Sequence, residues 1–160
     1  MNIIPMSIQN DSTTQSLKVD IYETAEVKIL HPGEGCGIEI QAENSMVFVL
    51  LVSESQILVK LTNGVTATFC SLFASYEDKF FYDPKNVFQV QLRNSRSLPL
   101  EIMQEPWGIE RKLPSGEFLL FEALDSPQAE PLSIRWLDHI LIVEGWIPPE
   151  DEIVRTVVWY

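Results

Sequence analysis

Apolar and polar residues alternate with a period of two along most of this chain. The segment VFQVQL at 87–92 is a clear case, because glutamines separate Phe88, Val90 and Leu92. Such alternation is typical of a strand with one buried face. The same criterion, with short apolar runs, predicts strands at 17–21, 27–30, 37–42, 46–52, 57–69 (as a hairpin), 87–92, 100–103, 117–123, 132–137, 139–146 and 153–160.

A helical period occurs at 71–82 alone, where Leu72, Phe73, Tyr76 and Phe80 share one face. The sequence therefore predicts an all-β fold: an antiparallel β-sandwich or barrel of about a dozen strands with at most one short helix. Strands and helices do not alternate, which argues against a parallel α/β sheet. We expect a flexible N-terminal segment at 1–16 and a single all-β domain at 17–160.

The segment ILVKLTNGVTATF at 57–69 contains an Asn-Gly pair, which favours a hairpin turn. A three-residue loop with Gly64 in the left-handed conformation would pair Leu61 with Val65 and make one face of the hairpin wholly apolar. A two-residue loop would mix apolar and polar residues on both faces. The three-residue loop is therefore the predicted one.

Two stretches share a turn-like motif: LHPGEGCGIE at 30–39 and LPSGEFLLFE at 113–122. A shift of the chain by 83 residues superposes the Leu, the Gly and both Glu, and also superposes Ile57-Leu58 on Ile140-Leu141. The pattern indicates an internal repeat of 25–77 and 108–160. Two carboxylates five residues apart lie on opposite faces of a strand, so we interpret the motif as a structural turn used twice rather than a catalytic pair.

The net charge of −12 disfavours binding to phosphate backbones and to anionic membranes. A basic protein is the partner that such a surface suits, and we expect either a monomer or a homodimer. Residues before Lys18 lack the pattern of a secretory signal, which makes the cytoplasm the expected location. Nucleotide-binding loops and catalytic serine motifs are absent from the sequence, so we expect no cofactor and favour a non-catalytic protein over an enzyme.

One alternative function centres on His31, Glu34 and Glu39, which are similar in type to the His and Glu ligands of cupin barrels. Those barrels place two histidines one residue apart, whereas this chain has only His31 and His139. The main prediction is therefore no metal site. The alternative is a cupin-like barrel that binds or transforms a small molecule with His31, Glu34 and Glu39 in its pocket.

The four tryptophans all lie in the second half of the chain. Trp136 is in phase with Leu132 and Ile134 and should be buried, whereas Trp107 lies in the turn-like EPWGIE and is the candidate binding residue. The C-terminal IVRTVVWY is apolar on both alternating faces apart from Arg155 and Thr156, which predicts a strand that is either central in its sheet or paired across a dimer, and we favour the central strand. Together these patterns predict a non-catalytic, acidic interaction module. The cupin-like site would require His31, Glu34 and Glu39 to line a cavity; exposure on a turn would favour the interaction module.

Overall fold

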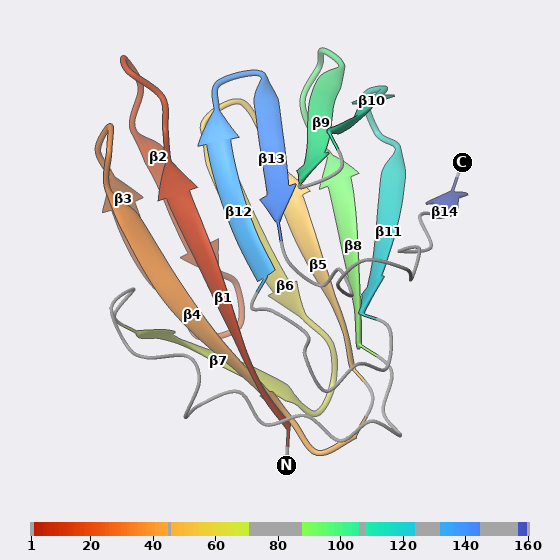
Figure 1. The fold of residues 1–160 in the computed structure, drawn as a ribbon. Helices are drawn as coiled ribbons and strands as arrows, with labels where there is room; N and C mark the ends of the chain where they lie inside the picture. Colours follow the sequence, from red (N-terminus) through yellow and green to blue (C-terminus); the bar gives the residue numbers. More distant parts are fainter. Residues whose placement is uncertain are drawn as a thin grey trace.

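The chain folds into two seven-stranded β-sheets that face each other (Figure 1). The structure, a computed structural model, describes residues 2–44, 46–70, 88–105, 108–123, 132–144 and 157–159. In order across the sheet, sheet A contains β10 (Ile109–Leu113), β9 (Leu100–Glu105), β13 (Ile140–Glu144), β12 (Leu132–Leu137), β1 (Asn2–Asn10), β4 (Gly35–Ala42) and β7 (Val65–Cys70). Sheet B contains β14 (Val157–Trp159), β11 (Phe118–Ala123), β8 (Phe88–Asn94), β5 (Met46–Val52), β6 (Gln56–Leu61), β2 (Leu17–Ile21) and β3 (Glu26–Leu30).

The predicted all-β class is confirmed, since the described residues contain strands and no helix. The segment 71–82, where the sequence predicted a helix, lies outside the described residues. Within the described part of the chain, no helix is long and apolar enough to cross a membrane.

The predicted sandwich differs from the structure in strand direction, because both sheets are mixed and not antiparallel throughout. Parallel pairs join β1 to β12 and β9 to β13 in sheet A, and β5 to β8 and β2 to β6 in sheet B. Alternation in the sequence determines which side chains face the core, but it carries no information about the direction of the neighbouring strand.

The first strand corrects the expectation of a flexible segment at 1–16. Residues 2–10 form β1, which lies inside sheet A between β12 and β4. Ile4, Met6 and Ile8 are buried at alternating positions. The strand was missed because Pro5 interrupts the alternating pattern, and proline is usually confined to strand edges. Here Pro5 lies opposite Glu39 in the register of β1 and β4.

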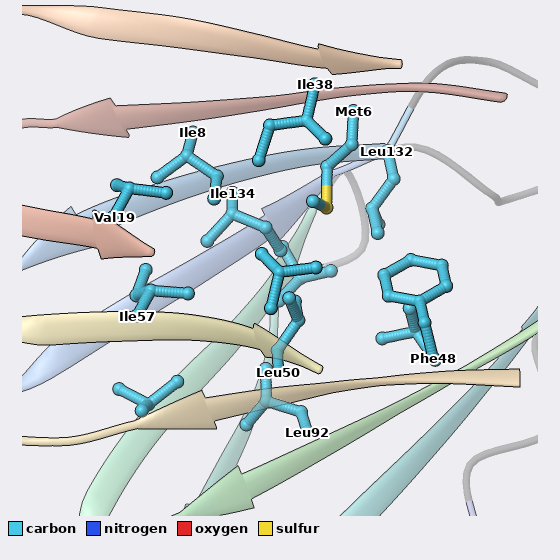
Figure 2. Packing of buried hydrophobic residues seen from close by; sticks show 14 of the residues in the cluster. Met6, Ile8, Val19, Ile38, Phe48, Leu50, Ile57, Leu92, Leu132 and Ile134 are labelled. Atoms are coloured by element: carbon cyan, nitrogen blue, oxygen red, sulfur yellow. The ribbon is translucent and has the colours of Figure 1, made fainter. Parts of the chain in front are cut away.

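One hydrophobic core fills the space between the sheets (Figure 2). Sheet A contributes Met6, Ile8, Ile38, Leu132 and Ile134, and sheet B contributes Val19, Phe48, Leu50, Ile57 and Leu92, all fully buried. Trp136 is fully buried as well, as its phase with Leu132 and Ile134 predicted. The alternating pattern thus placed Val90, Leu92 and Trp136 correctly in the core.

The predicted hairpin at 57–69 is wrong in its pairing. Gly64 has a φ of 81° and the Val65 N–H donates to the Thr62 carbonyl, so a tight turn forms where predicted. However, β6 belongs to sheet B and β7 pairs with β4 in sheet A. The turn passes the chain from one sheet to the other, and both strands still direct their apolar side chains into the same core.

The two halves of the chain have the same pairings in the same order. Each strand from β1 to β7 has a counterpart seven places later, so that β1 corresponds to β8 and β7 to β14. When every strand is exchanged with its counterpart, the strand order of sheet A becomes that of sheet B. Parallel and antiparallel relations are preserved throughout; β1–β4 and β8–β11, for example, are both antiparallel. The two halves therefore have the same topology, with the roles of the two sheets exchanged between them.

Four strands end the described sheets: β10 and β7 in sheet A, and β14 and β3 in sheet B. The position of β14 corrects the prediction that 153–160 forms a central strand. Two apolar faces favour a central strand only when a neighbour lies on each side. Of that segment, Val157–Trp159 is described, and it pairs with β11 alone.

Candidate functional site

The first motif of the sequence closes around a buried asparagine. Asn10, the last residue of β1, is fully buried, and its Nδ2 donates to the carbonyls of Gln15 and Leu30 at 2.8 and 2.9 Å. Its Oδ1 accepts from the Ser12 N–H at 3.0 Å. The Gly33 N–H donates to the Asn10 carbonyl at 2.8 Å. One side chain thus fastens the turn at 31–34 to the end of β1.

The second motif closes around Asn94 in the same way. Asn94 is fully buried at the end of β8, and its Nδ2 donates to the carbonyls of Leu98 and Leu113, both at 2.9 Å. Its Oδ1 accepts from the Arg96 N–H at 2.9 Å. The Gly116 N–H donates to the Asn94 carbonyl at 2.7 Å. Every contact of Asn10 thus has a counterpart around Asn94.

These networks explain why the two sequence motifs share a glycine, whereas the shared leucines, Leu30 and Leu113, are buried core residues. The leucine carbonyl accepts from the asparagine side chain, and Gly33 and Gly116 have φ values of 87° and 81°, which favour glycine. The glutamate that follows uses its backbone: Glu34 and Glu117 accept from the asparagine N–H groups through their carbonyls. The motif therefore closes a turn, and its chemistry is that of the backbone.

The structure places His31 and Glu34 on the exposed surface of this turn and Glu39 on β4. His31 Nδ1 lies 3.2 Å from the Ser16 hydroxyl, and the Glu34 N–H donates to the His31 carbonyl. Glu39 is half-buried and accepts from Gln41 Nε2 at 2.9 Å. The described residues contain no cluster of three or more His, Cys, Asp or Glu suited to a metal ion. Trp107, the candidate binding residue, lies outside the described residues.

A second polar cluster joins the loops after β1, β5, β8 and β12. The Ser12 hydroxyl donates to Asp138 Oδ1 at 2.7 Å, and Arg96 donates from Nη1 to the Asp138 carbonyl at 3.2 Å. Arg96 also lies 3.5 Å from a Glu54 carboxylate oxygen. Arg96 is mostly buried, so this cluster ties the two halves together near the two asparagines.

A nearby ion-pair network involves Arg135 on β12. Its Nε donates to Asp11 at 2.5 Å and its Nη1 to Glu144 at 3.5 Å. The hydrogen bond that Arg135 donates to Asp11 is the largest cause that raises the pKa of Arg135, and the negative charges of Asp11 and Glu144 act in the same direction. The guanidinium is partly exposed, so the network adds little stability.

Cys36 is a thiol in the core between the sheets. It is buried on β4, and this burial raises its pKa to about 11, slightly opposed by the positive charge of Lys28. A protonated thiol at neutral pH is a poor nucleophile. Cys36 therefore acts as a small apolar residue.

A cavity of about 270 Å³ lies over β9, β10 and β13 in sheet A. None of His31, Glu34 and Glu39 lines it. The outward-facing residues around it carry both charge signs, and Ile140 and Met103 supply apolar surface. The lining residues are Glu101, Ile102, Met103, Glu110, Arg111, Lys112 and Ile140.

The ribbon formed by β2 and β3, residues 17–30, exposes large apolar side chains. Tyr22, Val27 and Ile29 are 62%, 46% and 51% exposed. Val27 and Ile29 point to the outer face of sheet B because they alternate with Leu30, which is buried in the core. Sequence reasoning predicted the strand but not its exposure. The sequence did contain a signal for this exposure: Val27 and Ile29 lie at odd offsets from Leu30, so a strand that buries Leu30 must direct both of them to its other face.

Searches against protein-family models, curated proteins and solved structures found no match for this chain.

Proposed function

We propose that this chain is a non-catalytic protein-interaction module that binds its partner through the β2–β3 ribbon. The observation that carries the proposal is the exposure of Val27 and Ile29 on β3, the end strand of sheet B. Isolated exposed apolar residues are ordinary on protein surfaces, but here two lie on one face of one strand and Tyr22 lies in the adjoining turn.

The mode of binding follows from the position of β3. An end strand presents backbone N–H and C=O groups along its open side, and an extended segment of a partner pairs with them while its side chains contact the exposed face. The first four residues of β3 are all exposed. The ribbon therefore offers both backbone hydrogen bonds and an apolar surface.

The placement of His31 and Glu34 favours this function over the cupin-like alternative. Both side chains lie on an exposed turn, and Glu39 follows on β4. A pocket enzyme requires its acid, base or ligand groups to converge on one enclosed volume. In this chain the shared Gly is accounted for by the closure of the turn around Asn10, to which Leu30 and Glu34 contribute backbone carbonyls.

An internal repeat is part of the proposal. We infer that β1–β7 and β8–β14 derive from one duplicated unit, supported by the matched pairings and the matched asparagine networks. The equivalence has an offset of 83 at Gly33 and Gly116, as in the sequence alignment. At β6 and β13 the strand registers equate Ile57 with Leu141, whereas the sequence alignment equates Ile57 with Ile140, a difference of one residue. The repeat also begins at β1, earlier than the predicted 25–77.

The repeat makes the apolar ribbon distinctive. By the registers of β2–β3 and β9–β10, Val27 corresponds to Glu110 and Ile29 corresponds to Lys112. One edge of the molecule therefore carries apolar residues where the equivalent edge carries charges. Such a difference between equivalent positions fits a binding role for β3 rather than a requirement of the fold.

The test compares two substitutions of exposed apolar residues. Ile29→Lys alters the ribbon, and Leu98→Lys is the matched control because Leu98 is 59% exposed in a loop outside the ribbon. A protein captured from the natural host is purified, and its affinity for each variant is measured by titration. We expect Ile29→Lys to weaken binding roughly tenfold or more and Leu98→Lys to leave it unchanged. Equal affinity for wild type and Ile29→Lys would refute the proposal.

A further inference from the structure

We propose that the partner of β3 is a second copy of this chain, paired antiparallel about a twofold axis through Val27; this inference rests on the proposed function. In the resulting dimer, the two B sheets form one continuous sheet across the β3 edges. A twofold interface uses the same patch on both copies, so the patch must be complementary to itself. The short sequence of β3, Glu26–Leu30, meets this condition.

The charges of β3 select the register. With the axis at Val27, Glu26 of each copy lies opposite Lys28 of the other, and the two Val27 side chains meet on the outer face. Opposite charges at directly paired positions stabilise a sheet, whereas like charges destabilise it. Moving the axis to Lys28 would place the two lysines opposite each other. If the register between the two β3 strands changed by one residue, core-facing side chains of one copy would lie beside outward-facing side chains of the other.

The charge of the ribbon also bears on how closely two copies can approach each other. Each chain has a net charge of −12, so two copies repel each other at long range. Residues 17–30 contain three acidic residues, Asp20, Glu23 and Glu26, and two lysines, Lys18 and Lys28, which leaves a net charge of −1. That value matches the average charge density of the chain, but β3 itself carries one glutamate and one lysine and is neutral. Apolar contact and paired charges therefore face little repulsion along the strand that pairs.

One contact within the molecule restricts the side chain of Lys28. Its Nζ lies 5.1 Å from the centre of the Phe69 ring on β7, across from β3. This contact restricts the side chain before association, so less conformational entropy is lost when it meets Glu26 of the second copy. At the equivalent edge, Glu110 takes the place of Val27, and the same axis would bring two carboxylates together. The equivalent edge is therefore unsuited to the same pairing.

The test is an exchange of charges followed by sedimentation velocity at about 0.15 M salt, with chain concentrations up to about 1 mM. Glu26→Lys places lysines opposite each other and Lys28→Glu places glutamates opposite each other, so each variant should dimerise roughly tenfold more weakly than wild type. An equimolar mixture of the two variants restores both opposite-charge pairs and should dimerise like wild type. The double variant Glu26→Lys/Lys28→Glu should do so on its own.

Glu110→Lys is the control, because it makes the same charge change on the equivalent edge strand and should leave the dimer unchanged. Lys28→Glu also removes the contact with Phe69, so Glu26→Lys, which leaves that contact in place, is the decisive single variant. A wild-type chain that stays monomeric, or a dimer that Glu26→Lys does not weaken, overturns the inference. The proposed function would then still be decided separately, by the affinity of Ile29→Lys for the captured protein.

Discussion

Replacing either buried asparagine by alanine should destabilise the fold by a similar and large amount. Asn10→Ala removes three side-chain hydrogen bonds, to Gln15, Leu30 and Ser12. Asn94→Ala removes the three counterparts, to Leu98, Leu113 and Arg96. At about 1 kcal/mol for each net hydrogen bond, each variant should lose about 3 kcal/mol of the free energy of unfolding. Backbone groups left buried without a partner raise that cost.

The assay is urea unfolding at 25 °C, with the free energy obtained by linear extrapolation. Asn44→Ala is the matched control because Asn44 is exposed, and it should change the free energy by less than about 0.5 kcal/mol. A loss near 3 kcal/mol for one asparagine and near zero for the other would refute the equivalence of the two networks. Near-zero losses for both would refute their role in closing the turns.

Three further predictions concern the turn, the core and the buried thiol. Gly64→Val should cost about 1 kcal/mol or more in thermal unfolding through backbone strain alone, because φ is 81° and no atom lies within 4 Å of an added Cβ; an unchanged melting temperature would contradict it. Leu50→Ala should cost about 2–5 kcal/mol in urea unfolding, since Leu50 is fully buried between the sheets. Because the pKa of Cys36 is raised to about 11, the folded state holds this proton more tightly than the unfolded state. The contribution of Cys36 to stability should be constant below about pH 9 and fall by as much as about 2 kcal/mol as the pH rises to 11. Cys36→Ala should lack this part of the decline, and an identical pH profile for the variant and wild type would contradict the assignment.

Much of the core could be predicted from the sequence, whereas strand neighbours could not. The alternation of Phe88, Val90 and Leu92 identified a strand, and the phase of Trp136 placed it correctly in the core. Because both sheets face the same core, the alternating pattern does not indicate to which of the two sheets a strand belongs. This is why β6 and β7 were predicted as a hairpin, although the Asn-Gly turn carries the chain between sheets.

The candidate site shows a similar limit. The shared Leu, Gly and Glu of the two motifs were interpreted as a structural turn, and the hydrogen bonds to Asn10 and Asn94 give the physical reason. The asparagines themselves were missed because each precedes its turn by about twenty residues, and no local pattern links them. The apolar edge of β3 was missed because exposure depends on which strands end a sheet, and topology determines that.

The parallel pairing of β1 with β12 and of β5 with β8 has a consequence for the order in which the chain can fold. These pairs join the halves of both sheets, and in each pair the partners lie far apart in the sequence. During synthesis, the first half emerges with the open sides of β1 and β5 unpaired, and their partners are still to be made. Folding dominated by such distant contacts is slow, and unpaired strands are prone to aggregate. We therefore expect the completed chain to refold slowly, and the isolated first half to persist in solution only when the second half is supplied to it.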